Sequence, residues 1–263
     1  MSVVSVLYSG SSGNCTFVGD SSSGVLIDIG GSYKKTIEGL AVSGISIAAV
    51  RGVYITHEHI DHVKGLKIFQ KKHPEIPVYA NGKTISELIR QNNITDNGNI
   101  YIIEDKGNFS GEYQVIPFET LHDSVAANGY IVKKDGVKIA GIATDLGCVT
   151  DIVRQNLYGC PTVVIESNYD KAMLAVGKYA YYLKQRIMSD EGHLSNDQCC
   201  ELLPALVNQG TTRIILAHLS KENNMPDIAL GCAENALAQC GISSDRYVLV
   251  AASRDVPTKP IFF

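Results

Sequence analysis

Residues 57–62 (HEHIDH) bring three imidazoles and the carboxylate of Asp61 into six consecutive positions. They follow an apolar, β-branched run, 50–55, that predicts a strand, so the cluster begins where a strand gives way to a loop. His57 and His59 are two positions apart and lie on one side of the chain, while Asp61 and His62 continue round the turn. Nitrogen and carboxylate ligands suit zinc, manganese or iron. The spacing therefore predicts the centre of a metal site.

Further ligands must come from other parts of the chain, and three candidates share one feature, which is that each follows a predicted strand. They are His122 after residues 115–121, Asp145 after 138–144 and His218 after 214–217. Loops at the ends of adjacent strands hold side chains to within about 0.5 Å, because the sheet beneath them is rigid. His73, in the segment KKHP, is interpreted as a bystander with an ordinary hydrogen bond.

These motifs resemble the metallo-β-lactamase superfamily over nearly the whole chain. Residues 26–30 (LIDIG) look like its first motif, HxHxDH is its second, and the three further candidates match its third, fourth and fifth. The resemblance implies two divalent ions and a shared ligand set: His57, His59 and His122 on one ion, Asp61, His62 and His218 on the other, and Asp145 bridging them. It also implies that Asp28 accepts a hydrogen bond that orients the histidine loop.

Position 145 separates branches of this superfamily. Antibiotic-hydrolysing members commonly have Cys there, whereas Asp145, with two carboxylate oxygens, resembles the glyoxalase II and phosphodiesterase branches. Cys148 lies three residues later, out of register with that ligand position, and we expect it to be structural.

Three further segments resemble a narrower group, the WalJ (YycJ) type of bacterial DNA-processing nucleases: residues 9–15 (SGSSGNC), 166–170 (ESNYD) and 192–196 (GHLSN). In the first, Ser11 and Ser12 could present backbone N–H groups to an anion. In the third, His193 is suited to donate a proton to a leaving group, and Ser195 and Asn196 are candidate substrate contacts. Arg186, beside two tyrosines, is a candidate basic approach to the site.

The resemblance implies hydrolysis of a phosphodiester in nucleic acid, most simply DNA, by a hydroxide that bridges the two ions. We expect Asp61 to take part in catalysis as well as in metal binding. The same ligands also serve a glyoxalase II-like thioester or ester hydrolase, because the hydroxide could attack a carbonyl instead. A non-hydrolytic metal-containing binding module is a third alternative, which the intact ligand set disfavours.

The elements that must position these residues alternate between strands and helices. Strands are predicted at residues 3–8, 15–18, 24–29, 50–55, 77–79, 101–103, 114–120, 130–132, 137–144, 162–165, 213–216 and 247–250, with a hairpin turn at 134–136. Helices are predicted at 33–42, 64–72, 84–91, 195–207 and 226–239, the fourth opened by a capping box. Two β-rich regions accompanied by helices indicate an α+β, four-layer αββα sandwich. Since no linker or repeat divides the chain, residues 1–263 are expected to form one domain.

Bulk composition narrows the function without naming it. The 263 residues are 45% apolar and carry a net charge of -4, so a polyanion must be bound by a local basic patch or by metal. Seven cysteines without CxxC spacing argue against a disulfide framework or a thiolate zinc cluster. The sequence shows no signal peptide and no apolar stretch of about 18 residues, so a cytoplasmic protein without a membrane anchor is expected. Its oligomeric state is left open.

Overall fold

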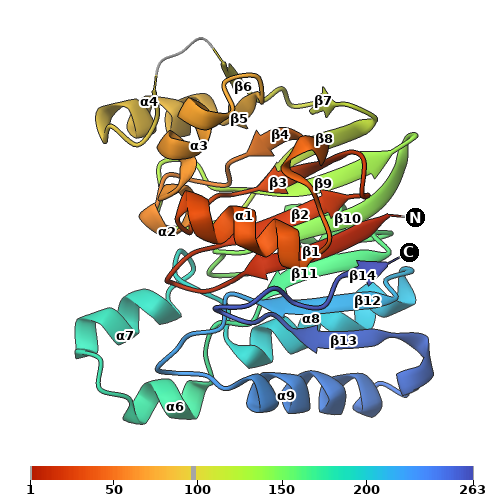
Figure 1. Cartoon of the computed structure of the whole chain (residues 1–263). Helices are drawn as coiled ribbons and strands as arrows, with labels where there is room; N and C mark the ends of the chain where they lie inside the picture. Colours follow the sequence, from red (N-terminus) through yellow and green to blue (C-terminus); the bar gives the residue numbers. More distant parts are fainter. Residues whose placement is uncertain (1, 96–98, 263) are drawn as a thin grey trace.

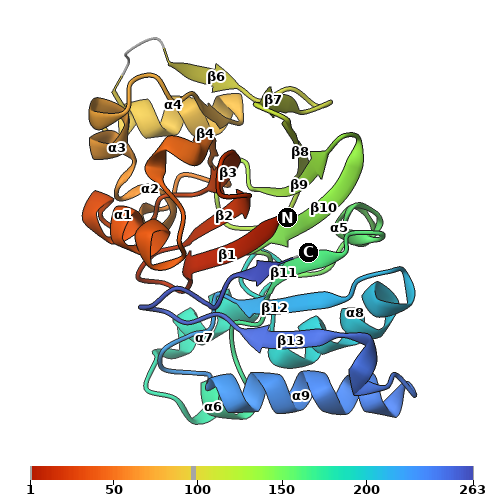
Figure 2. The same ribbon diagram turned by 45° about the vertical axis from the view of Figure 1, so that its right-hand side comes forward.

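Two seven-stranded sheets lie face to face in the computed structural model, which describes residues 2–95 and 99–262 (Figures 1 and 2). The first sheet has the order β14 (Ile261–Phe262), β1 (Val3–Tyr8), β2 (Cys15–Gly19), β3 (Gly24–Ile27), β4 (Val50–Tyr54), β5 (Val78–Ala80) and β6 (Ile100–Ile102). The second has the order β13 (Val248–Ala251), β12 (Arg213–Ala217), β11 (Thr162–Glu166), β10 (Val137–Ala143), β9 (Asn128–Lys134), β8 (Tyr113–Glu119) and β7 (Asn108–Ser110). The α+β sandwich predicted from the sequence is confirmed.

Helices cover the outer face of each sheet. On the first sheet lie α1 (Tyr33–Val42), α2 (Ile60–Val63), α3 (Leu66–Lys72) and α4 (Gly82–Arg90). On the second lie α5 (Asp151–Leu157), α8 (Asn196–Asn208) and α9 (Pro226–Gln239). Two more, α6 (Lys171–Val176) and α7 (Tyr181–Met188), connect β11 to α8, and single 3-10 turns span Ile47–Ala49 and Ser244–Arg246. None of the helices within the described residues is long and apolar enough to cross a membrane.

The buried apolar side chains form three clusters, one between each pair of neighbouring layers of the sandwich. Between the sheets, Val and Ile side chains surround Tyr54, Tyr113 and Tyr130, which are fully buried. A second cluster packs helix residues such as Leu40 and Phe69 against the first sheet, and a third packs the helices of the other side against the second sheet. Burial of these apolar faces, at about 25 cal/mol per Å², is the main force that holds the layers together.

Parallel strands in both sheets end at the same edge of the sandwich. β3, β4 and β5 are mutually parallel neighbours in the first sheet, and β10, β11, β12 and β13 are parallel neighbours in the second. Loops at the carboxyl ends of parallel strands meet at one edge, which is where open α/β sheets place their ligands. Most of the predicted ligands follow these strands and are brought to this edge. His122 instead follows β8, which pairs antiparallel with β7 and β9.

Strand and helix positions mostly agree with the prediction, and the differences have local causes. The predicted strand 24–29 ends at Ile27, because Asp28 turns the chain with φ 63°. The predicted helix 64–72 begins only at Leu66, and the short helix α2 precedes it. The hairpin turn at 134–136 and the capping box of Ser195 with Gln198 are both present.

Candidate metal centre

Four segments that are far apart in the sequence converge at one edge of the sandwich. The loop after β4 carries His57 and His59, and the following helix α2 carries Asp61 and His62. His122 follows β8, Asp145 follows β10, and His218 follows β12. Every residue that the sequence predicted as a metal ligand is therefore in one place.

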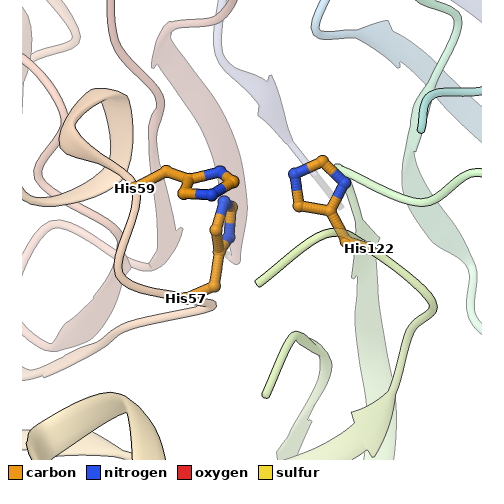
Figure 3. A group of neighbouring side chains, drawn as sticks. All are labelled: His57, His59 and His122. Atoms are coloured by element: carbon orange, nitrogen blue, oxygen red, sulfur yellow. The ribbon is translucent and has the colours of Figure 1, made fainter. Parts of the chain in front are cut away.

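The donor atoms of these residues form overlapping groups within 4.8 Å of one another. One group contains His57, His59 and His122, which Figure 3 shows as two rings from one loop and a third facing them from a separate segment. A second group contains Asp61, His62 and His218, and a third joins His57, His62 and Asp145. Asp145 thus lies between the two predicted ligand sets, as a bridging carboxylate must.

Several donor atoms in this cluster are buried without a hydrogen-bond partner, which is the arrangement that a cation satisfies. His57 Nε2, His218 Nε2 and Asp145 Oδ2 are all in this state. His62 Nε2 lies 3.1 Å from Asp145 Oδ2. A buried polar atom without a partner costs about 1–3 kcal/mol, so three together would be a large penalty. The residues present therefore fit divalent ions that take nitrogen and oxygen ligands.

The second nitrogen of most of these imidazoles is held by a partner outside the cluster. His62 Nδ1 donates to Asp28 Oδ2 at 2.7 Å, and Asp28 Oδ1 accepts from the backbone N–H of Thr56 at 2.8 Å. His122 Nδ1 donates to the carbonyl of Gly192 at 3.0 Å. Such bonds set the tautomer and turn the remaining lone pair toward the ion. The hydrogen bond to the histidine loop expected at Asp28 is present.

Glu166 is a site residue that the sequence reasoning did not single out. It is fully buried, and its Oε1 lies 2.7 Å from His218 Nδ1 and 2.8 Å from His193 Nδ1. Its Oε2 accepts from the backbone N–H of Leu146 at 2.9 Å, next to Asp145. One carboxylate thus orients both histidines. Two signals were available: Glu166 ends a buried strand, and it opens the segment ESNYD that the sequence analysis quoted.

Asn14 was also missed, although it lies in the segment SGSSGNC. Its Nδ2 is 3.0 Å from His62 Nε2 and 3.5 Å from Asp61 Oδ2, so it contacts the second ligand set directly. Its backbone N–H donates to the carbonyl of Asp61 at 2.8 Å. These hydrogen bonds hold the loop between β1 and β2 against the metal cluster.

The backbone at the site departs from ordinary strand geometry. Asp28, Asp145 and His218 have φ of 63°, 58° and 55°, in the left-handed region that costs most residues energy. Each follows a strand, and the turn redirects its side chain into the cluster. Gly30 meets a different demand, because a Cβ there would lie 1.5 Å from the carbonyl oxygen of Asp61. Only glycine allows the first motif to approach the histidine loop so closely.

Burial and neighbouring charges shift the pKa values in the cluster in both directions. Burial acts to lower the pKa of His62 and of His218, but Asp145 and the other facing carboxylates raise both well above the ordinary value. Burial lowers the pKa of His57, and the neighbouring imidazole of His62 adds to this effect, so the ring is held neutral as a metal ligand requires. Burial also acts to raise the pKa of Asp145, but the facing imidazoles of His218 and His62 lower it well below its usual value. The carboxylate between the two ligand sets is therefore ionised at neutral pH.

His193 lies at the rim of the cluster, with 22% of its side chain exposed. Its ring centroid is 5.2 Å from those of both His122 and His218. Burial acts to lower its pKa, but the Glu166 carboxylate on Nδ1 raises it, which favours the protonated form. His193 therefore lies beside both ligand sets, and its role as a proton donor stays a prediction.

The predicted substrate contacts separate into two groups. Ser11 and Arg186 line a cavity of about 180 Å³ together with His193, while Ser12 is exposed on the same turn as Ser11. The Arg186 guanidinium is ion-paired with Asp123 across this cavity. These positions suit contact with a substrate.

Ser195 and Asn196 require a correction, because the structure buries both and gives them internal partners. Ser195 is the N-cap of α8, where its hydroxyl accepts from the backbone N–H of Gln198 at 3.2 Å. Asn196 accepts from the hydroxyl of Ser167 at 2.7 Å and donates to Asn224 at 3.0 Å. Their contribution is to hold the His193 loop in place rather than to reach a substrate.

A Cys148→Ser substitution is expected to leave metal content and activity unchanged. Cys148 belongs to none of the possible metal-binding groups found in residues 2–95 and 99–262, and burial raises its thiol pKa. Elemental analysis of the purified variant would check this, with wild type as the reference. Loss of one metal equivalent would mean that the fourth ligand position was assigned to the wrong residue.

The four-layer sandwich and the histidine and aspartate cluster at one edge of its sheets define a class, the metallo-β-lactamase-fold proteins. The sequence model of the Beta-lactamase superfamily domain matches residues 25–219. An "Exodeoxyribonuclease YycJ" of Bacillus anthracis is 35% identical over 258 residues, which are 97% of each chain. An "Exodeoxyribonuclease WalJ" of Streptococcus pneumoniae is 35% identical over 241 residues, 90% of this chain and 89% of the relative. This chain therefore belongs to the metallo-β-lactamase superfamily and, within it, to the WalJ/YycJ-type group.

The fold has counterparts among solved structures as well. The metallo-β-lactamase fold protein YhfI from Bacillus subtilis matches with a TM-score of 0.71 and 13% sequence identity, over 98% of this chain and 99% of that chain. At this level of identity the likeness concerns the fold alone, and it agrees with the layer order described above.

Proposed function

We propose that this protein is a two-metal phosphodiesterase that degrades nucleic acid, most simply a DNA exonuclease. The observation in the site that supports this best is His193 at the rim of both ligand sets, because the ligand sets alone would also serve thioester hydrolysis. The names of the relatives, which are 35% identical over nearly their whole length, point in the same direction. The proposal is specific about the bond that breaks, and it leaves the polarity of cleavage to experiment.

Each ligand set would hold one ion, and Asp145 would contact both. His57, His59 and His122 would bind the first ion, and Asp61, His62 and His218 the second. Two such ions, when bound, would supply an activated water and neutralise charge on the phosphoryl oxygens. Asp61 keeps 19% of its side chain exposed, so its carboxylate can also orient the attacking water.

His193 would act as the general acid of this reaction. Its Nδ1 is engaged by Glu166 at 2.8 Å, which leaves Nε2 to donate a proton to the departing oxygen. Glu166 holds the ring in that tautomer and stabilises its positive charge, as the carboxylate partner of a catalytic histidine does. Ser11 and Arg186 line the cavity around His193 and would contact the phosphodiester there.

A substrate panel tests the proposal at low cost. It contains bis(p-nitrophenyl) phosphate, end-labelled single-stranded and duplex oligonucleotides of DNA and RNA, and a glutathione thioester. We expect metal-dependent cleavage of the nitrophenyl diester and stepwise shortening of an oligonucleotide. Hydrolysis of the thioester alone would favour the glyoxalase II-like alternative. Metal binding without turnover on any substrate would favour a non-hydrolytic binding module.

A further inference from the structure

A cavity of about 360 Å³ lies beside the metal centre, behind the loop that carries His218. Three serines line it, Ser9, Ser220 and Ser253, and two cationic side chains, Lys221 and Arg254, stand on its wall. These residues come from three separate loops, so the cavity is a product of the tertiary fold. Hydroxyl groups and cations together are the chemistry that binds phosphate in proteins.

Ser9 and Ser220 connect this cavity with the candidate active site. Ser9 Oγ accepts from the backbone N–H of His218 at 2.8 Å, which ties the cavity wall to a metal ligand. Ser220 borders both this cavity and the one that contains His193. Lys221 follows His218 by three residues, a span of at most about 11 Å of extended chain. A strand held at the metals would therefore reach Lys221 with its next phosphate or the one after.

Charge distinguishes this cavity from the two others that adjoin the metal centre. Its one acidic residue, Asp255, is ion-paired with Lys35 at 3.5 Å, so Lys221 and Arg254 leave the cavity wall with an excess of positive charge. Glu222 and Asp227 are close in sequence but are not among the lining residues. Since the whole chain has a net charge of -4, this local excess of positive charge is a departure from the average surface.

The other two cavities have less positive charge available to bind a polyanion. The cavity of about 450 Å³ beside His122 has one cationic residue and three acidic ones on its wall, namely Lys83, Asp105, Glu119 and Glu191. In the cavity around His193, Arg186 is paired with Asp123. Coulomb repulsion from carboxylates would disfavour a phosphate backbone at the first, so the backbone has its best path over Ser220 toward Lys221.

The side chain of Arg254 is held in position at this cavity. Its Nη2 donates to the carbonyl of Leu219 at 3.3 Å, and its stem packs on Gly10, where a Cβ would lie 3.5 Å from Arg254 Cγ. Gly10, with φ 141°, belongs to the segment SGSSGNC that the sequence analysis related to anion binding. The fixed stem keeps the guanidinium beside the cavity, which lowers the entropic cost of binding a ligand there.

We propose that this cavity, built by Lys221 and Arg254, is a binding subsite for a backbone phosphate of the polynucleotide, one or two nucleotides from the bond that is cleaved. This inference rests on the proposed nuclease function. If it holds, the uncleaved strand extends from the metal centre toward Lys221 and Arg254. It also accounts for nucleic-acid binding by an acidic protein, because the required positive charge is local.

Lys221→Ala, Arg254→Ala and the double variant test this subsite, with Lys133→Ala as the matched control. Lys133 lies near the end of β9 that is remote from the metals, beside the hairpin, and loses the same charge. We expect each cavity variant to raise KM for a single-stranded oligonucleotide on the order of tenfold, as for loss of a charged hydrogen bond. The ratio of kcat/KM for the oligonucleotide to kcat/KM for bis(p-nitrophenyl) phosphate should fall by the same factor. The salt dependence of log KM should decrease by about 0.7 per removed contact.

Binding of a labelled phosphorothioate oligonucleotide, measured by fluorescence anisotropy, separates this inference from the nuclease proposal. If wild type cleaves oligonucleotides and both cavity variants behave as Lys133→Ala does, the subsite is refuted and the nuclease function stands. If no phosphodiester is cleaved but binding still weakens in both variants, the subsite stands and the reaction was assigned wrongly. If the variants change only inhibition by inorganic phosphate, the cavity binds free phosphate and the subsite is refuted. Thermal unfolding of each variant would verify that it is folded.

Discussion

An Asp145→Ala variant is expected to lose both its activity and its metal. Asp145 is buried, ionised and placed between the two ligand sets, so its removal takes a carboxylate from both ions at once. It would also leave the imidazoles of His62 and His218 without the charge that faces them. Mutating residues outside the ligand set already costs about 10- to 100-fold in metal affinity or activity, so this loss should exceed 100-fold.

Elemental analysis and turnover of the nitrophenyl diester, measured on the same preparation, check this expectation. His57→Ala and His59→Ala should behave in the same way, because both belong to the first ligand set. His73→Ala is the control: its ring stacks on Tyr33 and hydrogen-bonds the tyrosine hydroxyl at 3.1 Å, away from the metal cluster. Full metal loading and wild-type turnover in Asp145→Ala would defeat the ligand assignment.

A His193→Ala variant is expected to lose cleavage of oligonucleotides by about 10²- to 10⁴-fold, the usual contribution of a general acid. A nitrophenyl phosphodiester should be affected far less, since its leaving group departs without a proton. Metal content should stay at the wild-type value, because His193 is outside the two ligand sets although its ring lies 5.2 Å from that of His218.

The two substrates and the metal measurement together make the His193 result interpretable. Equal slowing of both substrates with metals retained would show that His193 positions the substrate or the loop instead of donating a proton. Loss of metal would show that His193 is itself a ligand. The structure allows this, because His193 and Glu166 form a possible metal-binding group with Asp145 and His218. Each outcome assigns the imidazole a different role.

The candidate ligands were predictable because their signals are local. The strand before His57 is read from its apolar, β-branched residues, and the turn that follows places His57 and His59 on one side of the chain. His122, Asp145 and His218 each follow a strand that was predicted to within about two residues. Such patterns depend on neighbours within a few positions, so the sequence shows them without knowledge of the fold.

Helix α7, which precedes His193 in the chain, had no such signal. The helix has no buried residue, and its eight residues, YYLKQRIM, are too few to show a clear helical repeat of apolar side chains. Its place beside the active site follows from contacts with other parts of the chain, such as the bond from the backbone N–H of His193 to the carbonyl of Ile187 at 2.9 Å and the pairing of Arg186 with Asp123.

The sequence alone predicts the side chains that could bind metal and the alternation of strands and helices around them. Tertiary structure decided their partners: Glu166 joins His193 and His218 from 27 and 52 residues away, and Asn14 reaches His62 from 48 residues away. It also turned Ser195 and Asn196 inward and gathered Lys221 and Arg254 at one cavity. The physical reason is that hydrogen-bond partners, burial and local charge depend on which strands lie side by side, and residue periodicity along one strand carries no information about its neighbours.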